Sequence, residues 1–148
     1  MTHCIDLPNL ETISIGDGSF AYSEEFSISN TKQLVFLYIG NFCFHTVRKF
    51  WIIGQDHLQY LSIGNNSFTQ QIDSYGNDTS KSFRIENCTM LISIEIGPYS
   101  FSDFGGEFTL FNLPALQIIV IGRINYISYN FYFSNFIIVS RLHSLNLT

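Results

Sequence analysis

The sequence predicts a β-solenoid, a fold that grows by stacking one short unit on the next. An eleven-residue pattern, L-x-x-[LI]-x-[IL]-G-x-x-S-F, recurs along the chain at residues 10–20, 34–44, 58–68, 91–101 and 116–126, and 142–148 begins a sixth copy. The pattern has a nearly fixed period, which is typical of repeats that bury their apolar side against their neighbours. The composition, with 46% hydrophobic and 13% charged residues, excludes a disordered polar chain.

Each copy opens with a predicted short strand. Its aliphatic residues recur at positions i, i+3 and i+5, and the last two alternate as in a strand, so their side chains share one face. In stacked copies these positions form ladders, for example Ile15, Ile39, Ile63, Ile96 and Ile121.

A glycine ends this strand in every copy, where we expect a sharp turn or a positive φ. The glycines are Gly16, Gly40, Gly64, Gly97 and Gly122, so successive copies are 24, 24, 33 and 25 residues apart. An aromatic residue follows four positions later, and we expect this column to fill a corner of the coil. Its members are Phe20, Phe44, Phe68, Phe101 and Tyr126.

A second pattern, F-x-[IL]-x-N, lies between the copies at 26–30, 83–87 and 108–112, and at 50–54 with Gly54 in place of Asn. Alternating apolar residues that end at Asn or Gly predict another short strand followed by a turn. The prediction is therefore about five coils of 24–25 residues, with two narrow parallel sheets, a thin core and little helix.

Residues 1–148 are interpreted as a single repeat array with one insertion. The 33-residue step places that insertion at about 69–82, which is polar and rich in turn residues, so we expect a surface loop. Such insertions often line a binding face, and as often are neutral. The chain opens inside a repeat unit and closes within a strand, which predicts a segment of a longer array with further repeats at both ends.

Two segments carry a resemblance to a known family. The runs 15–20 (I-G-D-G-S-F) and 63–68 (I-G-N-N-S-F) resemble the I-G-x-x-A-F motif of the BspA-type (treponemal) leucine-rich repeats, with Ser for Ala. The F-x-I-x-N strand replaces that family's leucine strand. The resemblance implies a β-rich leucine-rich-repeat solenoid, adhesion or partner binding, no catalysis, and a cell-surface or extracellular location.

The strand residues expected to point outward supply the predicted contact sites. In the second and third copies they include Val35, Phe36, Tyr38 and Tyr60, which together would form an exposed apolar patch of the kind that marks partner sites. On the second sheet Trp51 is a further candidate, because exposed Trp is common in interface hot spots. The alternatives are that a missing flank covers the patch, and that Trp51 packs against a neighbouring loop.

Several partner classes are disfavoured by composition. Lys and Arg total 7 and the net charge is −5, which argues against a nucleic-acid partner held by phosphate contacts. The longest apolar runs, such as 35–39, are far too short to span a bilayer. An unidentified protein is therefore the expected partner, and the compartment is left open by the sequence itself.

No catalytic, cofactor or metal site is predicted. Asp73 and Asp78 share one loop, and Asp103 and Glu107 flank a Gly-Gly turn, so neither pair has the placement that acid–base chemistry prefers. The cysteine and histidine side chains fall in different columns, without metal-ligand spacing: Cys43, His45 and His57.

The function predicted from the sequence is non-enzymatic protein interaction or adhesion. The first alternative is a structural spacer, whose outward columns would be polar and interchangeable. The second is a carbohydrate-binding or carbohydrate-cleaving β-solenoid, which would place aromatic platforms beside paired carboxylates.

Overall fold

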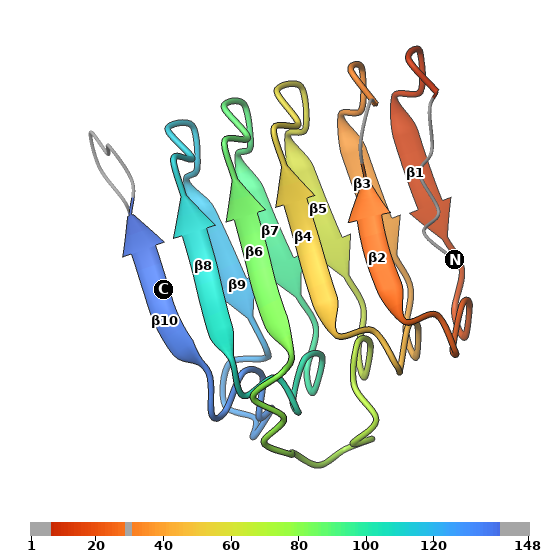
Figure 1. Ribbon diagram of the computed structural model, residues 1–148, viewed down its shortest axis with the longest axis vertical. Coiled ribbons are helices and arrows are strands. Elements are labelled where there is room, and N and C mark those ends of the chain that lie inside the picture. The colour runs from red at the N-terminus through yellow and green to blue at the C-terminus, as the bar shows by residue number, and fades with distance from the viewer. Residues whose placement is uncertain (1–6, 29–30, 140–148) are drawn as a thin grey trace.

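A computed structural model describes residues 7–28 and 31–139, which form two stacked parallel sheets (Figure 1). Sheet A contains β1 (Thr12–Ile15), β3 (Phe36–Ile39), β5 (Tyr60–Ile63), β7 (Ser93–Ile96) and β9 (Ile118–Ile121). Sheet B contains β2 (Glu25–Ile28), β4 (Lys49–Ile53), β6 (Ser82–Glu86), β8 (Glu107–Phe111) and β10 (Asn135–Val139). The chain alternates between the sheets, so it makes about five coils, and none of the described residues is helical. The predicted solenoid is confirmed.

The register of the strands aligns equivalent positions of successive coils. Ile39 pairs with Ile15 of the preceding coil and with Ile63 of the following one. In sheet B, Phe50 pairs with Phe83 although the insertion separates their strands. The predicted ladders are therefore present, and the insertion leaves the register intact.

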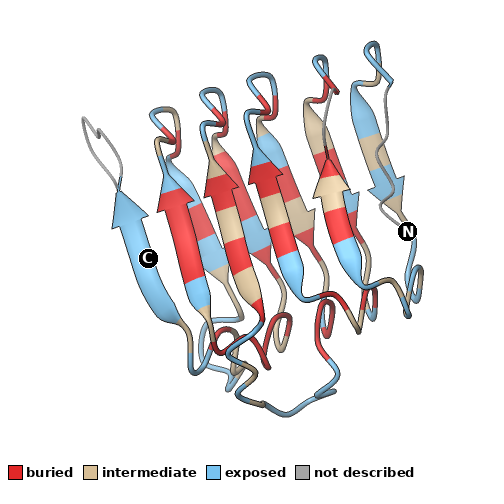
Figure 2. Cartoon of the chain, viewed as in Figure 1, coloured by how far each residue is buried: buried red, intermediate tan, exposed pale blue. Residues whose placement is uncertain are grey.

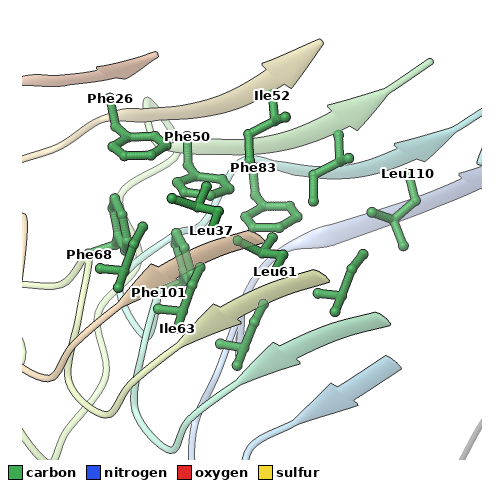
Figure 3. Packing of buried hydrophobic residues seen from close by; sticks show 14 of the residues in the cluster. Phe26, Leu37, Phe50, Ile52, Leu61, Ile63, Phe68, Phe83, Phe101 and Leu110 are labelled. Carbon is green, nitrogen blue, oxygen red and sulfur yellow. The ribbon is translucent and has the colours of Figure 1, made fainter. Parts of the chain in front are cut away.

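A thin apolar core fills the space between the sheets. Along the central strands, buried residues alternate with exposed or half-buried ones, as strand geometry requires (Figure 2). Leu37 and Leu61 of sheet A and Phe50 and Ile52 of sheet B are fully buried in it. Figure 3 shows Phe26, Phe50 and Phe83 arranged as one column of rings on the sheet B side.

Three of the repeat glycines, Gly40, Gly64 and Gly97, are required because the preceding coil approaches them closely. Among the five repeat glycines only Gly122 has a positive φ, of 76°. A Cβ on Gly64 would lie 2.6 Å from Asn41 Oδ1 and 2.7 Å from the carbonyl carbon of Gly40. Asn41 Oδ1 occupies that space because it accepts the Asn65 N–H of the next coil at 2.7 Å. A turn follows each of the five glycines, so the expectation of a sharp turn or a positive φ is confirmed, with the positive φ at Gly122 alone.

The predicted members of the aromatic column are confirmed in four coils, and the prediction is wrong in the fifth. Phe20, Phe44, Phe68 and Phe101 stack at 4.7–5.3 Å between ring centroids. The ring that continues the stack is Phe131, whose centroid is 4.9 Å from that of Phe101. The predicted Tyr126 is 57% exposed. The reason is a longer turn, because Phe131 follows Gly122 by nine residues, whereas Phe101 follows Gly97 by four.

A buried polar ladder runs beside these rings. Ser67 Oγ donates to the Gly40 carbonyl at 2.8 Å and accepts the Cys43 N–H at 3.1 Å. Ser100 repeats the donation to the Gly64 carbonyl at 2.6 Å and accepts the Ser67 N–H. These side chains satisfy backbone groups that the turn would otherwise leave unpaired inside the molecule.

Candidate interaction surfaces

Three of the predicted contact residues form one group on the outer face of sheet A. Phe36 stacks on Tyr60 of the next strand, with 5.2 Å between ring centroids and 8° between ring planes. It also stacks along its own strand on Tyr38, at 6.0 Å and 9°. Tyr38 and Tyr60 are 41% and 36% exposed. We call Phe36, Tyr38 and Tyr60 the aromatic strip.

Apolar residues extend the outer face of sheet A beyond the aromatic strip. Val35 is half-buried next to β3, and its carbonyl accepts the N–H groups of Gln59 and Tyr60 at 2.9 and 3.1 Å. Val35 therefore supports the strip chiefly through its backbone. Two coils further along, Ile118 and Val120 are exposed in the same columns.

Trp51 lies on the other side of the molecule from the aromatic strip. It belongs to β4 of sheet B, and the outward faces of the two sheets point in opposite directions (Figure 1). Lys49 Nζ lies 4.9 Å from the ring centroid and the Arg84 guanidinium carbon 5.2 Å, and the indole N–H donates to Ser82 Oγ at 3.1 Å. Trp51 is thus half-buried among neighbouring side chains, and the five predicted contact residues divide between two faces.

The insertion at 69–82 is exposed at its tip, as predicted, but its two ends are buried. Thr69 Oγ1 lies 2.9 Å from Ser102 Oγ in a buried hydrogen bond. Lys81 Nζ pairs with Asp103 Oδ2 at 2.7 Å, and these side chains are only 4% and 7% exposed. The Gln70 N–H donates to the same carboxylate oxygen at 3.1 Å. The loop is therefore docked on the following coil.

The structure places a group of aromatic side chains at this edge that the sequence analysis missed. Tyr75, from the insertion, lies 4.7 Å from Tyr129, 5.0 Å from Tyr132 and 5.9 Å from Phe133, between ring centroids. The signal was present in the sequence, because residues 129–133 form an aromatic run shortly after the last full copy of the repeat pattern. We define the tyrosine cluster as Tyr75, Tyr99, Tyr126, Tyr129, Tyr132 and Phe133.

One carboxylate is held beside the tyrosine cluster. Asp73 Oδ1 accepts from Asn66 Nδ2 at 3.0 Å, and the Asp73 N–H donates to Asn66 Oδ1 at 2.8 Å. Asn66 is buried, so this reciprocal pair fixes the loop. The hydrogen bond of the Tyr99 hydroxyl with Tyr126, with smaller contributions that include the charge of Asp73, raises the pKa of Tyr99. The Asn66 N–H in turn donates to the carbonyl of Pro98, the residue before Tyr99, at 3.0 Å, so the Asp73 carboxylate is held beside the cluster.

The other residues considered for chemistry have structural surroundings. Asp103 is the buried partner of Lys81. The Cys43 thiol lies 3.2 Å from the Gly16 carbonyl within the polar ladder, and burial raises its pKa. Among residues 7–28 and 31–139, no group of three or more His, Cys, Asp or Glu side chains is arranged to hold a metal ion. The same residues form no helix that could cross a membrane.

The core columns are uncovered at both ends of the described stack. At the first coil, an apolar pocket opens between the sheets, lined by Ile13, Ile15 and Phe26 among others. At the last coil, Phe136 and Ile138 continue the core columns of sheet B and are exposed.

Three comparisons with known proteins found no match: no family model, no curated protein and no solved structure matches this chain.

Proposed function

We propose that this protein is a non-enzymatic interaction or adhesion module, related to the BspA-type leucine-rich repeats, and that it binds a protein partner through the aromatic strip. The observation that carries the proposal is the stack of Phe36, Tyr38 and Tyr60 on the outer face of sheet A, in which both tyrosines are exposed and Phe36 is half-buried. The resemblance of the repeat motif to that family supports an adhesive role and a cell-surface or extracellular location.

The geometry of the strip suits protein recognition. Its rings are ordered before binding, because each lies against another ring at 8–9° and projects from a sheet that is fixed by its neighbours. Pre-ordered aromatic side chains lose little conformational entropy on binding, and aromatic residues are enriched in interface hot spots. Val35 borders the strip on one side, and Ile118 and Val120 lie in the same columns beyond Ser93 and Glu95 of β7.

A structural spacer explains this surface less well. Spacer repeats would carry polar, interchangeable residues in their outward columns. Here the outward columns of sheet A change along the stack, from Phe36, Tyr38 and Tyr60 in the strip, to Ser93 and Glu95 on β7, to Ile118 and Val120 on β9. The rings of the strip are not needed to fill the core, which lies on the other side of sheet A. An exposed aromatic group without a core role favours binding.

A capture experiment with surface extracts tests the proposal. The triple variant Phe36→Ser, Tyr38→Ser, Tyr60→Ser removes the strip, and we expect it to reduce capture of a partner about tenfold or more. The matched control is Ile53→Ser with Phe111→Ser, because both residues are exposed apolar side chains on the outer face of sheet B. Both proteins are first checked for folding by circular dichroism.

The pattern of capture decides between the two functions. Capture that survives in the sheet B control and is lost in the strip variant supports the module and locates its face. Empty capture lanes for all three folded proteins would favour the spacer. Equal capture of a partner by all three would contradict the aromatic strip as the binding site.

We also propose that further coils of the same kind cover both ends of the stack. The support is that side chains of the core columns, among them Ile13, Phe136 and Ile138, lack a covering layer in the described residues. Fusing one coil with matching ladder residues and a polar outer end to each end should raise the midpoint of thermal unfolding. An unchanged midpoint would argue against this role for the end faces.

A further inference from the structure

Two loops that interrupt the repeat pattern meet at one edge of the solenoid. The first is the insertion at 69–82 between β5 and β6, and the second is the longer turn between β9 and β10 (Figure 1). They come together through Tyr75, which contacts Tyr129, Tyr132 and Phe133. The remaining corners of this edge are short and regular, so the longer loops create a surface that the repeat alone does not provide.

Buried contacts hold this surface in place. The Lys81–Asp103 ion pair and the Thr69–Ser102 hydrogen bond hold both ends of the insertion on the following coil. Gly76 N–H donates to the Ser102 carbonyl at 3.1 Å, directly after Tyr75. Because its neighbours are fixed, Tyr75 is presented in one position, which lowers the entropy cost of binding a ligand.

The tyrosine cluster combines apolar ring faces with polar groups. Tyr75, Tyr132 and Phe133 are exposed, and the rings of Tyr129, Tyr132 and Phe133 are tilted by 40–53° to that of Tyr75. The cluster therefore offers several facets, each about the size of one sugar ring, unlike the single flat stack of the aromatic strip. The C–H face of a pyranose packs on an aromatic ring, while its rim of hydroxyl groups requires hydrogen-bonding partners.

Those partners are present at the edge of the cluster. The exposed Asp73 carboxylate uses Oδ1 to accept from buried Asn66, and this bond orients its other oxygen. A carboxylate so oriented accepts hydrogen bonds from sugar hydroxyl groups, and the tyrosine hydroxyls both donate and accept.

Charge selects among carbohydrates. Lys81 is buried and neutralised by Asp103, and Arg48 donates to Ser80 at the end of the insertion. Arg123 is exposed at the start of the second loop, whereas the exposed Asp73 carboxylate follows Asn66 and precedes Tyr75 at the rings themselves. A sulfated or carboxylated polymer stacked on these rings would meet the negative charge of Asp73. An uncharged ligand avoids this repulsion.

We propose that the tyrosine cluster is a second binding site, separate from the aromatic strip, and that it takes a neutral polysaccharide. Tyr75, Tyr132 and Phe133 supply the stacking faces, and Asp73 accepts hydrogen bonds from the sugar hydroxyls. The site binds and does not cleave, since one carboxylate is placed there and glycoside hydrolysis uses a pair.

Affinity electrophoresis in native gels tests this site directly. The probes are soluble galactomannan, mixed-linkage β-glucan, arabinoxylan and a soluble α-glucan, with heparin as the anionic comparison. We expect at least one neutral polymer to retard the protein, and Tyr75→Ala with Tyr132→Ala to weaken that binding about tenfold or more. Asn tolerates the positive φ of 51° at position 73 as Asp does, so Asp73→Asn keeps the backbone conformation. This substitution should weaken binding about tenfold or less.

The control variant is Tyr38→Ala with Tyr60→Ala, which removes two exposed tyrosines of the aromatic strip. It should be retarded like the native protein, so failure of this proposal is distinguishable from failure of the proposed protein-binding face. No retardation by any neutral polymer would overturn the proposal, as would equal retardation of the Tyr75→Ala, Tyr132→Ala variant. Retardation by heparin alone, or a protein partner captured through Tyr75 without polysaccharide binding, would assign the cluster to another ligand class and also overturn it.

Discussion

The chain contains two aromatic stacks that the repeat produces in the same way. In the inner stack, Phe44 and Phe68 lie 5.0 Å apart, and in the outer strip Phe36 and Tyr60 lie 5.2 Å apart. Both spacings are close to the distance between neighbouring strands in a sheet. In a parallel, in-register solenoid, aromatic residues in one column are therefore brought into stacking distance whatever their role.

Burial is what distinguishes the two stacks. Phe68 is fully buried, and its ring edge also contacts Phe50 of sheet B at 4.9 Å and 79°. Tyr60 is 36% exposed and projects away from the core. The inner stack thus contributes to stability, whereas the outer strip keeps ring surface available. For repeat proteins of this kind, stacking alone is no sign of function, and exposure of the stack is the informative property.

The largest expected difference in stability is between two variants that each lose one ring, one from the inner stack and one from the outer strip. Phe68→Ala should lower the free energy of unfolding by about 3–5 kcal/mol, because it leaves a cavity between two rings of its own column and the rings of sheet B. Tyr60→Ala should cost about 1 kcal/mol or less, since its ring is partly solvated in the folded protein. Chemical denaturation followed by circular dichroism measures both changes. Similar losses for the two variants would show that the outer strip is as structural as the inner stack.

Ionisation of a buried group gives the next largest effect. Burial raises the pKa of Cys88 to about 11, from an ordinary value of 9.0. The folded state therefore disfavours the thiolate, so the contribution of Cys88 to stability is complete below pH 9 and is lost as the pH rises through 11. The loss should reach about 2 kcal/mol at pH 11.

The Cys88→Ala variant isolates this contribution from that of the tyrosines, which ionise in the same range. Between pH 8.5 and pH 11, the free energy of unfolding of this variant should fall less than that of the native protein. If both proteins lose the same stability, then the thiol is accessible to solvent and the core at this position is more open than the structure describes.

A smaller effect is expected in the polar ladder that supports the inner stack. Ser67→Ala removes the donor to the Gly40 carbonyl and the acceptor for the Cys43 N–H. Two buried backbone groups lose a partner, so the free energy of unfolding should fall by about 1–3 kcal/mol. Ser62→Ala, on the outer face of the adjacent strand, is the matched control and should change stability by about 0.5 kcal/mol or less. Equal effects would show that the ladder hydrogen bonds add nothing to stability.

Sequence reasoning was accurate where one coil repeats the last. The strand ladders, the F-x-[IL]-x-N strand with Gly54 in the Asn position, and the position of the insertion all follow from alignment of equivalent residues. Gly54, Asn87 and Asn112 share a positive φ of 52–67°, which explains why those residue types alternate there. The aromatic strip was also predictable, because register and strand alternation suffice to place its side chains together.

The errors occurred where the repeat is interrupted. Tyr126 was assigned to the inner stack because it has the right offset from Gly122, but a longer turn gives that place to Phe131. The close approach at Gly40, Gly64 and Gly97 was not predicted, because the side chain that fills the space comes from the neighbouring coil, as Asn41 does at Gly64, and no pattern within one coil reveals such a contact. The tyrosine cluster was missed for the same reason.

The sequence by itself determined the period, the two-sheet solenoid and the columns that face the core or the solvent, since these are properties of a local pattern repeated in register. Only the tertiary structure decided how interruptions of the pattern pack: that Lys81 reaches Asp103, and that Tyr75 meets Tyr129 and Tyr132. Those contacts join segments with no shared periodicity, so their partners depend on the path of each loop over the coils beneath it.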